Sequence, residues 1–206
     1  MLLFNLFNNP IEIFVVILAL LTALTIHEFS HAWLANYLGD STAKRMGRVS
    51  LNPIVHLDFL GTIFLLLAGF GWGKPVIVNP NNFKNPKLDN LTVSLAGPIS
   101  NLLLASILGL VYRFLPGTDT LVLSILKIFI EINLILMIFN LLPIPPLDGS
   151  KIISIFTNET TYMAFQQIGI ILLFILIIFS SSIPVIPLLF TKTLGFFFSF
   201  ITGKPL

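Results

Sequence analysis

The chain has 206 residues, of which 56% are hydrophobic and 10% charged, and its formal net charge is +2. An ordinary soluble domain carries about 25% charged residues, so this composition, with a mean hydropathy of +0.99, excludes that class and indicates an integral membrane protein. The small net charge gives no reason to expect a nucleic-acid partner, and the absence of cysteine excludes disulfides, thiolate metal sites and cysteine nucleophiles.

The predicted elements are mainly membrane-spanning helices. The first ten residues contain no Lys or Arg, and the apolar run after them is longer than the core of a signal peptide, so we expect no cleavage there. A fifth, shorter segment, 183–201, contains two prolines and is expected to be kinked or partly interfacial. Four segments are long enough to cross about 30 Å of hydrocarbon as helices: residues 11–37, 91–114, 121–142 and 163–181.

Two segments between the first and second of these helices remain ambiguous. Residues 57–71 have a short apolar core interrupted by glycines and followed by prolines, which suits a re-entrant element better than a full span. Residues 74–83, KPVIVNPNNF, would form either a small β-hairpin over the site or an interfacial loop. The exposed edge of such a hairpin could pair with an unwound substrate strand. The predicted fold is therefore an all-α polytopic membrane protein with five to six transmembrane helices and a re-entrant or hairpin element after the first.

The basic residues indicate the topology. If residues 57–71 are re-entrant, both basic clusters lie on the cytoplasmic side, as the positive-inside rule favours. The first helix then runs from outside to inside, and residue 148 also comes to lie near the cytoplasmic side. The two clusters are Lys44, Arg45 and Arg48, and Lys74, Lys84 and Lys87.

The sequence HEFSH, residues 27–31, lies near the end of the first predicted helix. A helix turns about 100° per residue, so His27 and His31 share one face and can bind one metal ion, with Glu28 beside them as a general base. Two histidines that merely hydrogen-bond to neighbours are the alternative. The metal site is favoured because residues 13–26 carry no charge, and an ionisable cluster at the end of such a segment costs several kcal/mol unless it is paired or bound.

A catalytic zinc site needs a third protein ligand and an open position for water. The candidates are Asp40, His56, Asp58 and Asp148. We favour Asp148, because three prolines before it break the end of a transmembrane helix, and unwound backbone at membrane depth is tolerated where it lines a cavity. The alternative for Asp148 is a helix N-cap.

Several motifs together resemble a known family. HEFSH, AGPISN at 96–101 and NLLPIPPLDG at 140–149 resemble the site-2 protease family of intramembrane zinc metalloproteases. LNPIVHLD at 51–58 and GWGKPVIVNPNNF at 71–83 resemble its compact prokaryotic branch, which lacks PDZ and CBS domains. The resemblance covers about residues 10–155, whereas residues 160–206 match nothing diagnostic.

The resemblance implies a set of site residues. His27, His31 and Asp148 would be the ligands of one Zn²⁺ per chain, and Glu28 would be the catalytic base. Asn140 would lie at the active site and help to stabilise the oxyanion, although from the residues alone it could equally cap the broken helix. The domain organisation expected is one intramembrane metalloprotease domain over residues 1–206, with the core at 10–155 and extra C-terminal helices at 160–201.

Other polar residues have simpler explanations. We expect Asn101 to hydrogen-bond across helices and His56 to be an interfacial histidine near Asp58 or to line the site. Lys127 and Glu131 are one turn apart in an apolar helix and are expected to neutralise each other.

The function expected is that of a zinc endopeptidase. It would hydrolyse a peptide bond in the transmembrane segment of a single-span membrane protein, in regulated intramembrane proteolysis. It would lie in the cell membrane of a bacterium or archaeon, with the active site toward the cytoplasmic side. A membrane metal-binding protein or metal transporter that uses the same cluster is the rival, and a structural scaffold is a third alternative.

Overall fold

The computed structural model describes residues 10–68, 71–115, 121–179 and 185–206. Within these ranges it contains no strand, which confirms the all-α prediction, and five of its helices are long and apolar enough to cross a membrane. The chain is thus a multi-pass membrane protein. The five helices are α2 (Pro10–Tyr37), α5 (Pro86–Phe114), α6 (Leu121–Asn140), α8 (Glu159–Phe179) and α9 (Val185–Thr202).

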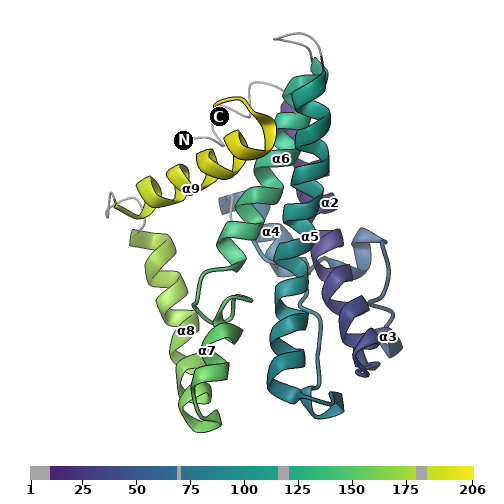
Figure 1. Ribbon diagram of the computed structural model, residues 1–206, viewed down its shortest axis with the longest axis vertical. Coiled ribbons are helices and arrows are strands. Elements are labelled where there is room, and N and C mark those ends of the chain that lie inside the picture. The colour runs from purple at the N-terminus through teal and green to yellow at the C-terminus, as the bar shows by residue number, and fades with distance from the viewer. Residues whose placement is uncertain (1–9, 69–70, 116–120, 180–184) are drawn as a thin grey trace.

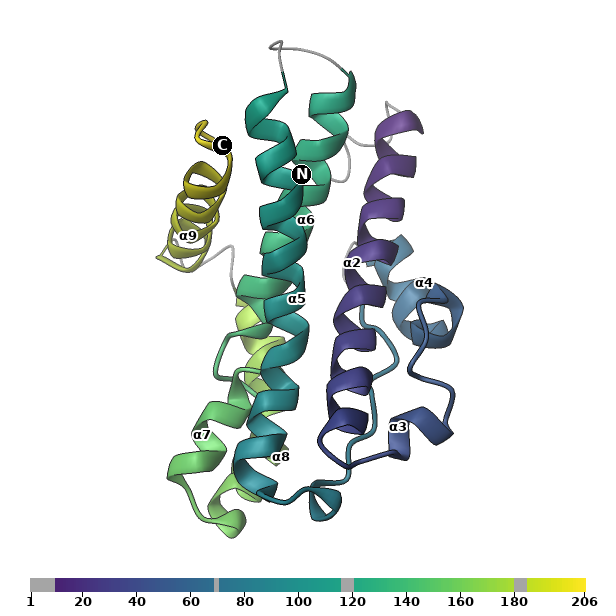
Figure 2. The same cartoon turned by 45° about the vertical axis from the view of Figure 1, so that its right-hand side comes forward.

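A bundle of α2, α5 and α6 forms the centre of the molecule (Figures 1 and 2). The residues that α2 buries include alanines at four positions, Ala19, Ala23, Ala32 and Ala35. Lipid gives helices little hydrophobic reason to associate, so small residues that let backbones approach closely are what hold such a bundle together. Larger apolar side chains of α2, such as Phe14 and Leu18, are exposed on its outer face, where lipid would cover them.

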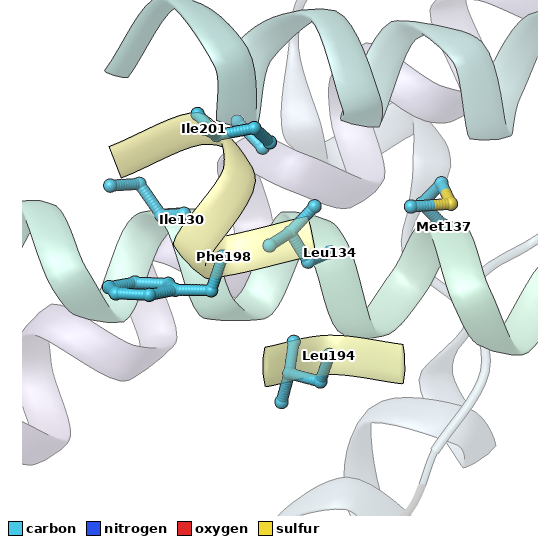
Figure 3. Close-up of a cluster of buried hydrophobic side chains, with 7 residues drawn as sticks. Ile130, Leu134, Met137, Leu194, Phe198 and Ile201 are labelled. Carbon is cyan, nitrogen blue, oxygen red and sulfur yellow. The ribbon is translucent and has the colours of Figure 1, made fainter. Parts of the chain in front are cut away.

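The C-terminal helix α9 lies obliquely across α5 and α6 (Figure 1). It is one uninterrupted helix, because Pro187 falls in its first turn, where a proline costs no helical hydrogen bond. Pro184 lies outside the described residues. Figure 3 shows the buried cluster at this contact, to which α9 contributes Leu194, Phe198 and Ile201, and α6 contributes Ile130, Leu134 and, further along the helix, Met137.

The helix α8 stands apart from this bundle. It packs against the short helix α7 (Ser150–Phe156), beside which it lies in Figure 1. Gly169 gives α8 a second contact, because a Cβ there would lie 2.5 Å from the Cβ of Pro145. The helix α8 therefore contacts the loop that follows α6, the loop that carries Asp148.

The segment 57–71 leaves the bundle and returns to the same place. The helix α4 (Phe59–Ala68) has 10 residues, so it is about 15 Å long, half the hydrocarbon thickness. Leu57 and Gly73 form an antiparallel bridge, and the Lys74 N–H donates to the His56 carbonyl at 2.8 Å. Because the two ends meet, this geometry supports the re-entrant alternative, although residues 69–70 lie outside the described part.

The segment 74–82 is an extended loop that ends in the turn η2 (Pro80–Asn82), and no hairpin is found in it. Its first residue, Lys74, is held by the buried guanidinium of Arg48. This group donates to the carbonyl of Lys74 and to that of Val55, which lies in the turn η1 (Pro53–His56). Its other end is held by the buried carboxylate of Asp40, next to α3 (Thr42–Arg45). This acid accepts hydrogen bonds from the Asn79 N–H and the Asn82 amide, both at 2.7 Å.

Replacing Asp40 with Asn will destabilise the protein at neutral pH. Burial alone would raise the pKa of this carboxyl, but hydrogen bonds from Thr42, Asn79 and Asn82 outweigh it and lower the pKa below 3.8. A lowered pKa in the folded state stabilises the protein at neutral pH, and this contribution is lost as the pH falls through the folded value. We expect a loss of about 1–3 kcal/mol at pH 7 that shrinks below pH ~4. Thermal unfolding in detergent at several pH values measures it. Glu159→Gln, at the exposed start of α8, is the control, and a loss that is independent of pH would contradict the prediction.

Candidate metal centre

Two histidines of α2 meet at the middle of the bundle. His27 and His31 are one turn apart, both are buried, and their Nε2 atoms lie 3.0 Å from each other. Both therefore point toward one spot, as their spacing predicts.

Asp148 reaches the same spot from the loop after α6. Its Oδ2 atom lies 3.1 Å from Nε2 of His27 and 3.3 Å from Nε2 of His31. The loop is closed by the Gly149 N–H, which donates to the Asn140 carbonyl at 2.7 Å. A Cβ at Gly149 would lie 2.1 Å from the Leu141 carbonyl oxygen, so only glycine allows this closure. The structure thus brings His27, His31 and Asp148 together.

The outer nitrogens of both imidazoles face acceptors. Nδ1 of His27 lies 2.7 Å from Oδ1 of Asn101, and Nδ1 of His31 lies 2.7 Å from the Val93 carbonyl. Because oxygen atoms accept at both places, each Nδ1 carries the proton and each Nε2 presents a lone pair to the centre. Metal-binding histidines are commonly held in this way. The hydrogen bond between His27 and Asn101 also joins α2 to α5, which confirms the expected contact of Asn101 across helices.

The three converging atoms fit a divalent metal. Two lone pairs and a carboxylate oxygen face one another with no proton between them, and among the described residues Oδ2 has no hydrogen-bond partner. Such an arrangement is repulsive without a cation. Their separations of 3.0–3.3 Å are close to the ~3.3 Å between ligand atoms of a tetrahedral zinc with bonds of about 2.0 Å.

Gly97 of α5 keeps the space beside the imidazoles open. A Cβ at this position would lie 2.4 Å from Nε2 of His31 and 2.6 Å from Nε2 of His27. Any other residue would therefore place a carbon atom against the two nitrogens that face the centre.

A cavity of about 540 Å³ surrounds the cluster. Glu28 lines it, and its Oε2 accepts a hydrogen bond from the Val76 N–H at 3.2 Å, so the extended loop 74–82 orients this carboxylate. Asn140 lines the same cavity, with its side-chain nitrogen donating to the Leu136 carbonyl at 3.0 Å. Within the described ranges the Asn140 side-chain nitrogen has this one acceptor, so its second N–H is available to another partner. The five residues implied by the family resemblance therefore share one cavity.

The other candidate third ligands have partners elsewhere. His56 is buried, with Nε2 bonded to the Ser50 carbonyl at 2.7 Å, and Asp58 accepts from the Gly61 N–H at the start of α4. Asp40 anchors the loop 74–82, as described above. The expected pairing of Lys127 with Glu131 is present, at 3.7 Å.

Sequence reasoning missed two residues near the site. Gly97 belongs to the motif AGPISN, but its closeness to the imidazoles of His27 and His31 becomes visible only when α5 packs on α2. Asn133 of α6 is fully buried and accepts a hydrogen bond from Asn101 at 2.9 Å. An amide in the middle of an apolar helix was the available signal for Asn133, since buried polar groups in membranes need partners.

The chain is similar to known proteins of one family. The model of the family described as "Peptidase family M50" matches residues 118–180. The chain is 47% identical over 149 residues to "Putative zinc metalloprotease YwhC" of Bacillus subtilis, covering 66% of each chain. It is 29% identical over 178 residues to "Putative zinc metalloprotease Rip2" of Mycolicibacterium smegmatis, covering 82% of this chain and 68% of that one.

The match to a third relative covers a larger share of that relative's length. "Putative zinc metalloprotease MJ0611" of Methanocaldococcus jannaschii is 31% identical over 150 residues, or 71% of this chain and 73% of that one. The matched segments span about two thirds of the length of the Bacillus and Mycolicibacterium relatives. No solved structure matches the chain.

Proposed function

Because the chain belongs to peptidase family M50, the site-2 protease family, we propose that it is a zinc-dependent endopeptidase that cuts other membrane proteins within their transmembrane segments. The observation that carries the proposal is the convergence of His27, His31 and Asp148 on one point, beside Glu28, in a cavity among apolar helices. The relatives' names give zinc as the metal, and the two-histidine, one-carboxylate donor set fits it.

The three ligands and the base divide the chemistry between them. His27, His31 and Asp148 would hold the metal and leave one position open. A zinc ion in such a site acidifies water and polarises a carbonyl group. Glu28 accepts the proton that water loses and then passes it to the nitrogen of the leaving amine. The Val76 N–H holds the Glu28 carboxylate in place for both transfers.

Asn140 is the proposed oxyanion donor. It lines the cavity, and one N–H of its amide is engaged by the Leu136 carbonyl. The second N–H can donate to the oxygen on which charge develops during hydrolysis, an interaction worth several kcal/mol in a site sheltered from water.

The substrate is proposed to be a single-span membrane protein whose helix unwinds near the cut. A helical peptide bond is shielded by its own hydrogen bonds, so a helix-breaking residue near the scissile bond will make cleavage easier. The extended loop 74–82 borders the cavity through Pro75, Val76 and Val78. Its backbone offers a surface against which an unwound segment can lie. Cleavage of this kind fits a role in regulated intramembrane proteolysis.

The active site is proposed to lie toward the cytoplasmic side of the cell membrane. Lys44, Arg45 and Arg48 follow α2, and the positive-inside rule places such clusters in the cytoplasm. Trp33 and Tyr37 are exposed and stacked at this end of α2, as is typical of residues at the membrane interface. His31 is six residues before Tyr37, so it lies about 9 Å along the helix from that level.

Reconstitution separates the protease from a metal carrier. Wild-type protein in liposomes is incubated with a single-span substrate that contains a helix-breaking pair, or with a matched substrate whose span is all leucine. We expect cleavage of the first, mapped by mass spectrometry to the transmembrane segment, and its loss with a zinc chelator. Zinc flux across the liposome membrane without cleavage of either substrate would instead identify a carrier.

A further inference from the structure

A pair of asparagines links three helices behind the metal centre. Asn101 of α5 and Asn133 of α6 are both fully buried, and Asn101 also contacts α2 through His27 and the Ala23 carbonyl. Two buried amides in contact with each other are costly in an apolar bundle unless every hydrogen-bonding group is used.

The partners of Asn101 permit one orientation of its amide. Its side-chain nitrogen donates to the Ala23 carbonyl at 3.1 Å and to Oδ1 of Asn133 at 2.9 Å. Turning the amide over would put its oxygen against both of these acceptors and leave its nitrogen facing His27. Oδ1 of Asn101 therefore faces Nδ1 of His27, at 2.7 Å. An oxygen at that place requires the proton of His27 to be on Nδ1.

Asn133 is itself oriented by the backbone. Its side-chain nitrogen donates to the Phe129 carbonyl one turn earlier, at 2.8 Å. This bond turns Oδ1 of Asn133 toward Asn101. The direction of every hydrogen bond, from the Phe129 carbonyl to the imidazole of His27, is thus fixed by two backbone acceptors, the carbonyls of Phe129 and Ala23.

We propose that Asn133 and Asn101 form a hydrogen-bond relay that keeps His27 in the tautomer whose Nε2 is free to bind metal. Asn133 is a positioning residue, since it contacts neither the metal position nor substrate. The inference rests on the proposed function in that His27 serves as a metal ligand.

The two histidines differ in what fixes the position of their ring proton. His31 is oriented by the backbone carbonyl of Val93, which no side-chain substitution removes. His27 depends on side chains, and changes to the relay should therefore act on His27 alone. The simpler alternative is that the two asparagines only join α5 to α6, as polar side chains do in membrane bundles.

Zinc affinity of the purified protein distinguishes the two explanations. Asn133→Leu removes one of the two acceptors that orient the Asn101 amide and leaves the Ala23 carbonyl as the other. We therefore expect zinc affinity, measured by competition with a chromogenic chelator, to fall about 10-fold, the lower end of the range for residues behind a metal ligand. In an Asn101→Leu background His27 has lost its side-chain acceptor, so Asn133 can no longer act on it. There Asn133→Leu should change zinc affinity less than about threefold. Ser106→Ala, which removes a hydrogen bond to the Leu102 carbonyl within α5, is the control and should leave zinc affinity unchanged.

Different outcomes of these measurements would disprove the relay and the proposed function. If Asn133→Leu lowers the unfolding temperature but leaves zinc affinity at the wild-type value, the asparagines join helices and the relay is wrong. If Asn133→Leu does not fold, Asn101→Leu decides. The relay predicts a 10–100-fold loss of zinc affinity for this variant, and a wild-type zinc affinity would overturn it. A wild-type protein that binds no zinc would overturn the proposed function itself.

Discussion

The Glu28→Gln variant will bind one zinc per chain and will cleave a transmembrane substrate about 10²–10⁴-fold more slowly than the wild type. Glutamine has nearly the shape of glutamate, and its oxygen can still accept the hydrogen bond from the Val76 N–H. What it cannot do is take a proton from water and return it to the leaving amine. Zinc content is measured by elemental analysis, and the cleavage rate is measured under single-turnover conditions in detergent.

Glu159→Gln, which makes the same change at the exposed start of α8, is the matched control and should keep full activity. Loss of zinc from Glu28→Gln would mean that Glu28 is a ligand rather than a base. Undiminished cleavage would remove Glu28 from the mechanism altogether.

The Gly97→Ala variant will lose zinc binding and, with it, all detectable cleavage. The added methyl group would lie 2.4 Å from Nε2 of His31 and 2.6 Å from Nε2 of His27, distances at which something must move. We expect a loss of zinc affinity greater than the 10–100-fold typical of residues behind a ligand. In a helix interior, alanine is otherwise favoured over glycine by about 0.5–1 kcal/mol, so the metal-free variant should still fold. The rise in unfolding temperature on adding zinc measures the effect.

Gly195→Ala is the control for this substitution. It makes the same change inside a helix, at a position where a Cβ would have no atom within 4 Å. It should bind zinc like the wild type. If Gly97→Ala also showed the full zinc-dependent rise in unfolding temperature, the metal would not lie between the two imidazoles.

The helices could be predicted from the sequence because the bilayer restricts which backbone structures can cross it. In hydrocarbon every backbone group must be satisfied within the chain, so a long apolar run is a helix. The start of α5 was predicted five residues late, at residue 91, because its first turns are polar, whereas the helix begins at Pro86, a favoured first residue. Residues 57–71 needed the structure, because the bridge between Leu57 and Gly73 joins positions that hydropathy treats independently.

The site was predictable to the extent that it is local. The spacing of His27 and His31 is enough to place both on one face. The third ligand depends on which distant loop reaches that face. The sequence favours Asp148, but only the structure shows that Asp40, His56 and Asp58 have partners elsewhere. Asn133 could not be connected to His27 from the sequence, because the connection passes through Asn101 on a different helix.

Zinc titration of metal-stripped wild-type protein tests the central claim most directly. A chelator removes the metal, zinc is returned in measured amounts, and cleavage of a single-span transmembrane substrate is followed at each step. The account predicts no cleavage without metal, and a rate that rises in proportion to added zinc and levels off at one zinc per chain. Full cleavage by the metal-free protein would contradict it.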